Sequence, residues 1–510
     1  MKKTTLVATL TETPDESGRW LDALDGVDVL EVRADLVGDL DPDWLRDRFD
    51  GELLYTLRSR AEGGASDDDR EARDARLVKA AGRYDLVDLE LERDLIPEVL
   101  TKISPGVRLL SWHGSASNLT ALKGRFERMA STEARYYKLI TKARHEGDSL
   151  RPLALLDDLR RDDVVSFAMG DIGAWTRVIA PRLGSPLVYG AMGDTPGAPG
   201  QMTIERLRRD FGLPWLPEAD RLCGILGRPV MHSLSPRLHN GAYRALGIPA
   251  LYVPFHAESF GDFWLDVVEM EDLARFGLPL RGLSVTAPHK DAALAVAGAT
   301  SPRADRIGAA NTLVWHEGVW EAESTDPEGV TGALEHLGCE LEGARAAVVG
   351  CGGAGKAAAF GLALAGARVT LVNRGTERGR QASEELGLPF VPLADLDPGE
   401  FEVLVQATAL GHHADDPLPF DTDRLRRGAA VVEMVYGDRP TALEVSAAEA
   451  GCRVVSGREV LLHQALGQFR LMNDRTLEPA LASELLGLGD GASTTDREPN
   501  ATLDNPEEST

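Results

Sequence analysis

The chain has 510 residues, enough for roughly two to four domains that each bury a core, and a formal net charge of −26 at pH 7. This acidity is spread over both halves, which favours solubility and argues against nucleic acid or an anionic membrane as partner. The four cysteines, Cys223, Cys339, Cys351 and Cys452, form no C-x-x-C pair, so we expect neither a disulfide framework nor a metal site. No signal peptide is evident and no apolar run approaches the ~18 residues of a membrane span, which favours a cytoplasmic protein.

Residues 1–218 alternate short apolar runs with amphipathic, charged stretches. This strand-then-helix rhythm predicts an α/β fold, a (β/α)8 barrel of parallel strands with its chemistry at the C-terminal strand ends. The expected strands cover residues 4–10, 27–32, 52–57, 85–91, 107–112, 136–141, 164–169 and 187–191.

Polar side chains stand at or just beyond the ends of these expected strands. They are Thr9, Glu31, Arg33, Arg58, Glu62, Glu90, His113, Lys138, Arg177 and Gln201. Lys138 has aromatic and aliphatic neighbours, so burial and nearby Arg charge should lower its pKa and free an amine nucleophile. An ion-paired or snorkelling lysine is the alternative. His113, one strand away, can act as a general acid or base and favours imine chemistry.

Five motifs fall within residues 1–210: EVRAD at 31–35, TLRSRAEGG at 56–64, SWH at 111–113, YKL at 137–139 and APGQ at 198–201. On these motifs, residues 1–210 resemble type I 3-dehydroquinate dehydratase. The resemblance implies that Lys138 forms a Schiff base with the substrate ketone, that His113 removes the adjacent proton and helps to expel water, and that Glu62 orients His113. It also implies that the substrate carboxylate and hydroxyls are held by Arg33, Arg58, Arg177 and Gln201, with Glu31 and Thr9 beside them. Thr176 and Gly197 replace serines common in the family, and the missing hydroxyl at Gly197 is expected to weaken loop closure over the substrate.

A proline-containing link at 213–217 separates the halves, and residues 221–330 are predicted to form an α/β substrate domain. Ser233 and Ser235 precede a helix started by a proline, where they can donate to a carboxylate or polyol; a simple N-cap by Ser235 is the alternative. Small-residue turns then offer Lys290 and Asp326. A lysine and an aspartate brought together can share the proton that a ketone needs when hydride arrives.

Residues 350–355 read GCGGAG, between an apolar run and an Ala/Leu-rich helical pattern, and predict a nucleotide-binding domain over 331–460. Such glycines allow a tight turn, close approach of a pyrophosphate and close helix–strand packing, with the helix N-terminus facing the phosphates. A plain strand-to-helix turn is the alternative. After the next expected strand, Asn373 and Arg374, with Arg378 nearby, replace the acidic residue typical of NAD sites, which indicates NADP.

An ordered set of motifs runs through residues 221–485: HSLSP at 232–236, VTAPHK at 285–290, ANT at 310–312, TD at 325–326, the glycine turn, NR at 373–374, and Tyr436, Thr441, Gly457 and Gln464. On these motifs, residues 221–485 resemble shikimate dehydrogenase. The resemblance implies that Lys290 and Asp326 carry the proton transfer. It implies shikimate binding by Ser233, Ser235, Thr286, Asn311, Asp326, Tyr436 and Gln464, and NADP contacts from Gly350, Cys351, Gly352, Gly353, Ala354, Asn373, Arg374, Arg378, Met434 and Gly457. Ser324, Gln406 and Glu433 depart from the family pattern at the periphery of the cofactor site, and His412–His413 is expected to be an exposed loop rather than a metal pair.

Together the resemblances imply a bifunctional enzyme that dehydrates 3-dehydroquinate to 3-dehydroshikimate and reduces this ketone to shikimate with NADPH. A catabolic, quinate-directed dehydrogenase is one alternative. A non-catalytic metabolite sensor is another, and the presence of the catalytic lysines argues against it. Helices over 461–486 are expected to return to the substrate domain, so that the cleft lies between the two domains. The polar, acidic stretch 489–510 is expected to be disordered. The oligomeric state is left open.

Overall fold

A computed structural model of the protein describes residues 2–14, 19–193, 195–413, 415–437 and 439–489. The chain divides into two compact units, Met1–Ala299 with Thr312–Ala322, and Thr300–Asn311 with Glu323–Thr510. The expected disordered stretch 489–510 lies outside the described residues except for Gly489. Within the described part of the chain, no helix has both the length and the apolar character that a bilayer crossing requires.

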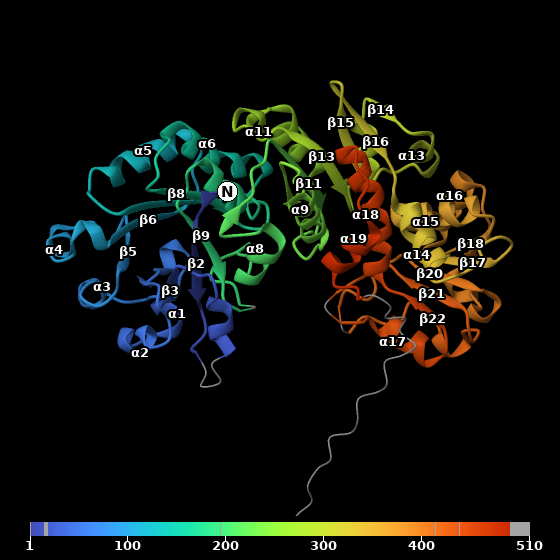
Figure 1. The fold of residues 1–510 in the computed structure, drawn as a ribbon, viewed down its shortest axis with the longest axis horizontal. Helices are drawn as coiled ribbons and strands as arrows, with labels where there is room; N and C mark the ends of the chain where they lie inside the picture. Colours follow the sequence, from blue (N-terminus) through green and yellow to red (C-terminus); the bar gives the residue numbers. More distant parts are fainter. Residues whose placement is uncertain (1, 15–18, 194, 414, 438, 490–510) are drawn as a thin grey trace, which may run out of the picture. The chain divides into compact units, whose positions relative to one another are not determined.

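The first unit begins with the predicted barrel (Figure 1). Its strands are β2 (Thr5–Leu10), β3 (Val29–Arg33), β4 (Glu52–Thr56), β5 (Leu86–Glu90), β6 (Arg108–Gly114), β7 (Tyr136–Lys142), β8 (Val164–Met169) and β9 (Leu187–Ala191). They form one parallel eight-stranded sheet in the order β8-β7-β6-β5-β4-β3-β2-β9. Every strand end lies within about two residues of its predicted position, so the barrel prediction is confirmed.

Helices cover the outside of the barrel (Figure 1). In α5, Leu122, Phe126 and Met129 share one buried face, and Asn118 caps its start by accepting a hydrogen bond from the N–H of Ala121. The helices of this half are α1 (Ala34–Val37), α2 (Pro42–Arg46), α3 (Arg70–Ala81), α4 (Pro97–Leu100), α5 (Leu119–Ala130), α6 (Leu150–Leu159), α7 (Thr176–Ile179) and α8 (Ile204–Phe211). Short β1 (Lys2–Lys3) pairs antiparallel with β10 (Trp215–Leu216), inside the segment that the sequence indicated only as a link.

A second sheet completes the first unit. Its strand order is β12 (Ala250–His256), β11 (Arg221–Gly227), β13 (Leu280–Val285), β15 (Thr312–His316), β16 (Val319–Glu323) and β14 (Ala299–Thr300). β11 is parallel to both β12 and β13, whereas β15 runs antiparallel to β13. The helices α9 (Ser235–Leu246), α10 (Phe260–Phe263), α11 (Asp272–Arg275) and α12 (Lys290–Val296) follow its strands.

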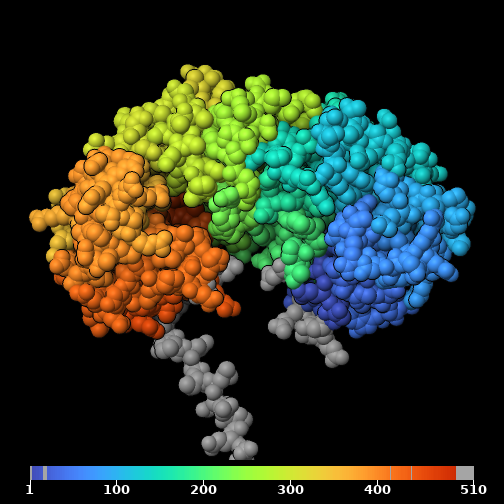
Figure 2. All heavy atoms as spheres, turned by 180° about the vertical axis from the view of Figure 1, so that it is seen from behind, coloured from blue at the N-terminus to red at the C-terminus, as the bar shows by residue number. Residues whose placement is uncertain are grey.

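The barrel and this sheet are joined by buried polar and aromatic contacts. Asp210 of α8 is fully buried and accepts hydrogen bonds from Nε of Arg206 (3.1 Å) and from Nε of Arg237 on α9 (2.9 Å). The rings of Trp175 and Phe255 meet edge to face, 5.1 Å between centroids. In Figure 2 the teal residues of the barrel and the green residues of the following domain pack directly against one another. The joint therefore makes the barrel and the sheet one compact body.

The second unit contains a parallel six-stranded sheet. Its order is β19 (Phe390–Pro392), β18 (Arg368–Asn373), β17 (Arg345–Val349), β20 (Val403–Gln406), β21 (Ala430–Glu433) and β22 (Arg453–Val455). The chain runs outward from β17 in one direction and then continues from β20 in the other, so the carboxyl ends of β17 and β20 form the switch point where such folds bind ligands. The helices are α13 (Pro302–Ile307), α14 (Asp326–His336), α15 (Gly353–Leu364), α16 (Thr376–Leu386), α17 (Ala442–Glu449), α18 (Gly457–Asn473) and α19 (Pro479–Leu486).

Candidate active sites

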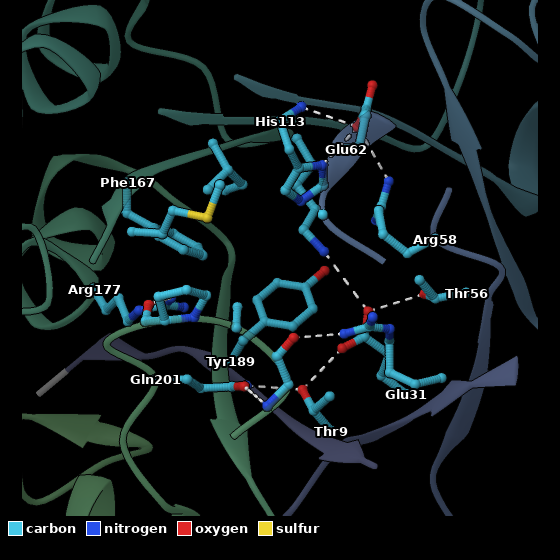
Figure 3. A pocket seen from close by; sticks show the side chains of 18 of the residues that line it. Thr9, Glu31, Thr56, Arg58, Glu62, His113, Phe167, Arg177, Tyr189 and Gln201 are labelled. Carbon is cyan, nitrogen blue, oxygen red and sulfur yellow. Dashed lines mark hydrogen bonds and ion pairs between the residues drawn. The ribbon is translucent and has the colours of Figure 1, made fainter. Parts of the chain in front are cut away.

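One pocket at the carboxyl ends of the barrel strands collects the residues predicted for this half. It is lined by Thr9, Glu31, Arg33, Thr56, Arg58, Glu62, His113, Lys138, Phe167, Arg177, Tyr189 and Gln201, among others (Figure 3). Each expected polar residue except Glu90 reaches this lining, and Glu90 lies directly behind it, 3.3 Å from Arg58. The convergence follows from parallel topology, because all carboxyl strand ends meet at one mouth.

Lys138 lies on β7 with its side chain almost fully buried in this pocket. Its Nζ lies 3.7 Å from Oε1 of Glu31 and 3.7 Å from Oδ2 of Asp88, and 4.0 Å from the ring centroid of Tyr189. The carboxylate distances are too long for strong hydrogen bonds, so this lysine is not locked in a tight ion pair. Burial lowers the pKa of Lys138, and the two carboxylates only partly oppose that effect. The amine is therefore more available as a nucleophile than an exposed lysine would be.

His113 and Glu62 form a buried pair beside this lysine. Glu62 Oε2 accepts a hydrogen bond from the backbone N–H of His113 at 3.0 Å and lies 2.8 Å from His113 Nδ1. Burial, together with the charges of Arg58 and Lys138, lowers the pKa of His113 well below its usual value. Burial also raises the pKa of Glu62 to about 8, against the opposing charge of Arg58. The imidazole is thus held neutral, and its Nε2 is the nitrogen that can face a substrate.

Arg58 is fixed by a network that sequence reasoning missed in part. Its two terminal nitrogens contact Asp88 at 2.5 Å and Ser111 at 2.8 Å, and the Ser111 hydroxyl donates to Asp88 at 2.5 Å. Asp88 stands two residues before Glu90 on β5, hence on the same face of the strand. That alternation is the signal by which it could have been found. Tyr189 of β9 was missed as well, although it also lines the pocket.

The loop after β9 contains the departure at Gly197. The carbonyl oxygen of Gly197 accepts a hydrogen bond from Arg33 at 2.6 Å, and its N–H donates to Oε1 of Gln201 at 2.8 Å. A Cβ at this position would lie 2.8 Å from the Thr9 methyl group, too close for normal contact. A glycine therefore fits this position, where the loop packs closely against Thr9. Its backbone also holds Arg33 and Gln201, two of the residues predicted to bind the substrate.

In the second half, four predicted residues belong to the first unit. Ser233 and Ser235 are buried after β11, where the N–H of Ser235 donates to the Ser233 hydroxyl at 3.2 Å. The N-cap of α9 is Leu234, without a side-chain capping bond, so the alternative of an N-cap by Ser235 is wrong. Thr286 follows β13 and Lys290 starts α12. Because β11 and β13 are parallel neighbours, these residues stand at the same edge of the sheet.

Three further predicted residues gather in the second unit around the start of α14. Nδ2 of Asn311 donates to Asp326 Oδ1 at 2.6 Å and to Thr325 Oγ1 at 3.1 Å, and all three residues are buried. Gln464 of α18 lies against α14, because a Cβ added at Gly329 would meet the Cβ of Gln464 at 3.1 Å. Tyr436 is half-buried in the loop after β21. Asp326 is therefore oriented by an amide, and the second unit holds it together with Asn311 and Gln464.

The glycine turn lies between β17 and α15. A Cβ on Gly355 would meet the carbonyl oxygen of Gly350 at 1.8 Å, and a Cβ on Gly350, whose φ is +111°, would meet Ala407 O at 2.7 Å. Gly352 differs, because the nearest atom to its hypothetical Cβ is the Arg378 guanidinium at 3.6 Å. The backbone is therefore open where a pyrophosphate would approach, with a cation beside it, which fits a phosphorylated dinucleotide better than a plain turn.

The side chain of Asn373 braces this turn. Its Oδ1 accepts a hydrogen bond from the N–H of Cys351 at 3.2 Å, and its Nδ2 donates to Gly375 O at 2.8 Å. Arg374 and Arg378 are exposed, which leaves their guanidinium groups accessible to a ligand phosphate.

Two of the departures are braces for loops at the same carboxyl edge. Gln406 is fully buried; its amide donates to Leu410 O at 2.7 Å and accepts from the N–H of Thr408 at 2.8 Å. Glu433 accepts from the N–H of Val435 at 2.9 Å and from the Thr441 hydroxyl at 3.1 Å.

The remaining predicted residues of this half have varied surroundings. Ser324 is buried before α14, and its N–H donates to Oε1 of Glu323 at 2.7 Å. Gly457 starts α18 with no room for a side chain, since its Cβ would lie 2.4 Å from Val435 O, and Met434 is half-buried after β21. His412 and His413 are both exposed, as predicted.

Both halves of the chain are similar to known proteins. Residues 7–213 match the model of type I 3-dehydroquinase, and residues 225–313 match that of the shikimate dehydrogenase substrate binding domain. A bifunctional 3-dehydroquinate dehydratase/shikimate dehydrogenase of Arabidopsis thaliana is 30% identical over 481 residues, 88% of this chain and 77% of the relative. A shikimate dehydrogenase (NADP(+)) of Syntrophobacter fumaroxidans is 38% identical over 49% of this chain and 87% of its own length. A solved shikimate 5-dehydrogenase of Thermus thermophilus, in complex with NADP(H) and shikimate, is 33% identical, with a TM-score of 0.47 over 52% of this chain and 98% of the other.

The similarity to the plant protein spans both halves and most of each chain. The type I 3-dehydroquinase model covers the barrel, and the shikimate dehydrogenase model covers part of the sheet that follows it. The chain therefore belongs to the family of bifunctional 3-dehydroquinate dehydratase/shikimate dehydrogenases.

Proposed function

We propose that this chain catalyses two consecutive steps of the shikimate pathway in the cytoplasm. The barrel dehydrates 3-dehydroquinate to 3-dehydroshikimate, and the second half reduces 3-dehydroshikimate to shikimate with NADPH. The observation that carries the proposal is the barrel pocket, in which one buried amine, Lys138, lies among carboxylates beside a neutral histidine. Membership of the bifunctional family supports the second step.

In the dehydration, the Lys138 amine attacks the ketone carbon, and loss of water gives an iminium ion that acidifies the neighbouring C–H. Neutral His113 takes that proton, and Glu62 stabilises the imidazolium that results. The proton then goes to the departing hydroxyl, which leaves as water. A second water hydrolyses the imine and returns the free lysine.

The guanidinium groups of the pocket would hold the substrate carboxylate. Burial lowers the pKa of Arg177 to about 9, because few opposite charges surround it. A substrate carboxylate would supply the missing charge in bidentate form. Arg33 and Gln201 each form a hydrogen bond with the backbone of Gly197. The loop that contains Gly197 is therefore coupled to the two side chains that would bind the substrate hydroxyls.

In the reduction, NADPH would supply hydride to the carbonyl carbon. Arg374 and Arg378 would bind its 2′-phosphate, and the N-terminus of α15 would face its pyrophosphate. Lys290 and Asp326 would deliver the proton to the alkoxide oxygen, with Asn311 keeping the Asp326 carboxylate in one orientation. Ser233, Ser235, Thr286, Tyr436 and Gln464 would bind the ring hydroxyls and carboxylate.

A two-stage assay on the purified chain tests the function. Dehydroquinate alone should produce the conjugated enone of dehydroshikimate, and later addition of NADPH should consume it with equimolar loss of nicotinamide absorbance. Quinate and NAD serve as comparison substrates for the reverse reaction. Absence of enone from dehydroquinate would refute the first activity, and faster oxidation of quinate than of shikimate would redirect the second.

A further inference from the structure

The barrel pocket contains one hydroxyl group that has no role in the mechanism above. Three hydroxyl side chains line the pocket, and Thr9 and Thr56 both donate to the Glu31 carboxylate, at 2.8 and 2.9 Å. The third, the phenol of Tyr189, is only 3% exposed, and its oxygen has no hydrogen-bond partner among the described residues. Buried polar groups nearly always have partners, so an unpaired one that lines a pocket needs an explanation.

Tyr189 occupies the centre of this pocket (Figure 3). It comes from β9, and its ring lies under the Lys138 amine, with Nζ 4.0 Å from the ring centroid. When this amine attacks a carbonyl carbon, the carbonyl oxygen is only one bond further away and stays in the same part of the pocket. The phenol is thus close to the position where negative charge develops on that oxygen.

The other donors around the amine are already engaged. Arg58 contacts Asp88 and Ser111, Arg33 binds Asp35 and Gly197 O, and Nε2 of Gln201 donates to Thr9 at 3.0 Å. Arg177 keeps an unpaired Nε, but as a buried guanidinium it suits the substrate carboxylate. The Tyr189 hydroxyl is therefore the neutral group that can still donate a hydrogen bond to the carbonyl oxygen.

We infer that Tyr189 is a further catalytic residue of the dehydratase, whose hydroxyl donates a hydrogen bond to the ketone oxygen that Lys138 attacks and to the carbinolamine oxygen that this attack creates. The inference rests on the proposed imine chemistry. No proton is transferred to the substrate by the phenol, because burial raises its pKa well above the ordinary value and keeps it protonated. His113 takes the proton that the attacking amine loses when the carbinolamine forms, and then gives it to the carbinolamine oxygen, which leaves as water. The face of the tyrosine ring also favours the positive charge that remains on the imine nitrogen.

The test is Tyr189→Phe, which removes only the hydroxyl. Donors to a developing oxyanion act in the transition state, so we expect kcat for dehydration to fall roughly 10- to 100-fold with little change in KM. Trapping of the imine by borohydride under single-turnover conditions should slow by the same factor. Because no described residue forms a hydrogen bond with the hydroxyl, its removal should leave the melting temperature equal or raised. Lower activity with undiminished stability is a combination that a merely structural tyrosine would not give.

Tyr84→Phe is the matched control. Its hydroxyl is also in the barrel, but it donates to Leu40 O at 3.1 Å. This variant should keep dehydratase activity and lose some thermal stability. If Tyr189→Phe keeps kcat and the trapping rate within about twofold of a wild type that dehydrates dehydroquinate, the inference is overturned while the proposed function stands. A wild type that does not trap dehydroquinate would overturn both.

Discussion

The two candidate sites are built in different ways. The barrel pocket lies entirely in one compact unit. Short contacts hold His113, Arg33 and Arg58 there, whereas the Lys138 amine lies 3.7 Å from each of two carboxylates. The residues predicted for the reduction are divided, with Ser233, Ser235, Thr286 and Lys290 in the first unit, and Asn311, Asp326, Gln464 and the glycine turn in the second.

This difference matches the chemistry of the two proposed reactions. An imine mechanism needs its nucleophile desolvated and its base neutral before the substrate arrives, and a closed barrel can fix both in advance. A hydride transfer has to accept and release a large cofactor in every cycle, so residues carried by separate units suit it better. We therefore expect substitutions in the barrel pocket to affect dehydration only, and substitutions of the residues predicted for the reduction to affect reduction only.

Loss of the Lys138 amine should have the largest effect. We expect Lys138→Ala to lower dehydratase kcat by on the order of 10⁴-fold or more. Among the described residues that line the pocket, Lys138 is the only buried lysine. Reduction of added dehydroshikimate should stay within about twofold of wild type. Dehydratase activity that survives in this variant would exclude the imine mechanism.

Lys290→Ala should reverse this pattern. A general acid typically contributes on the order of 10²- to 10⁴-fold, so reduction should slow by that range while dehydration continues unchanged. Asp291→Ala is the control, since Asp291 is the exposed neighbour on the same turn of α12. Equal losses in the two variants would mean that the helix, rather than the amine, was damaged.

Arg378→Ala tests the cofactor assignment with a smaller effect. Loss of one exposed cation beside Gly352 should raise KM for NADPH by roughly 10-fold and leave KM for NADH unchanged. Arg380→Ala, an exposed arginine two residues further along α16, should change neither. A parallel rise in both KM values would argue against a 2′-phosphate contact.

The smallest expected effect is a shift in pH dependence. Burial lowers the pKa of Lys138, and the carboxylate of Asp88 raises it in part. Imine formation should therefore increase with pH, with a midpoint below the ordinary 10.5 of a lysine. The Asp88→Asn variant loses a negative charge that favours the protonated amine, so the midpoint should move lower still. The pH profile of borohydride trapping measures this midpoint. A midpoint that moves upward would show that Asp88 does not act on the amine.

Much of the barrel could be predicted from the sequence because its signals are local. Apolar runs with long connections indicated eight parallel strands, and the rule that chemistry sits at their carboxyl ends selected Lys138, His113 and Glu62. The glycine turn was predicted in the same way, from the spacing of its glycines between an apolar run and a helical pattern. The predicted strand ends and turn residues therefore lie close to their observed positions.

What could not be predicted depends on contacts between distant segments. Strand alternation places Asp88 on the inner face, but nothing local shows that it meets Arg58 and Ser111. The pairing of Asp210 with Arg237, which joins barrel and sheet, likewise has no local signature. Gln406 departs from the family pattern at the periphery of the predicted cofactor site, and the sequence alone does not show that its amide braces the loop beyond β20.

The most direct test of the imine mechanism is borohydride reduction of the enzyme during turnover of dehydroquinate, followed by peptide mass mapping. We expect one adduct per chain, on the peptide containing Lys138, with dehydratase activity lost in proportion and dehydroshikimate reduction retained. Substrate-dependent inactivation without an adduct on Lys138, or an adduct on another lysine, would contradict the account.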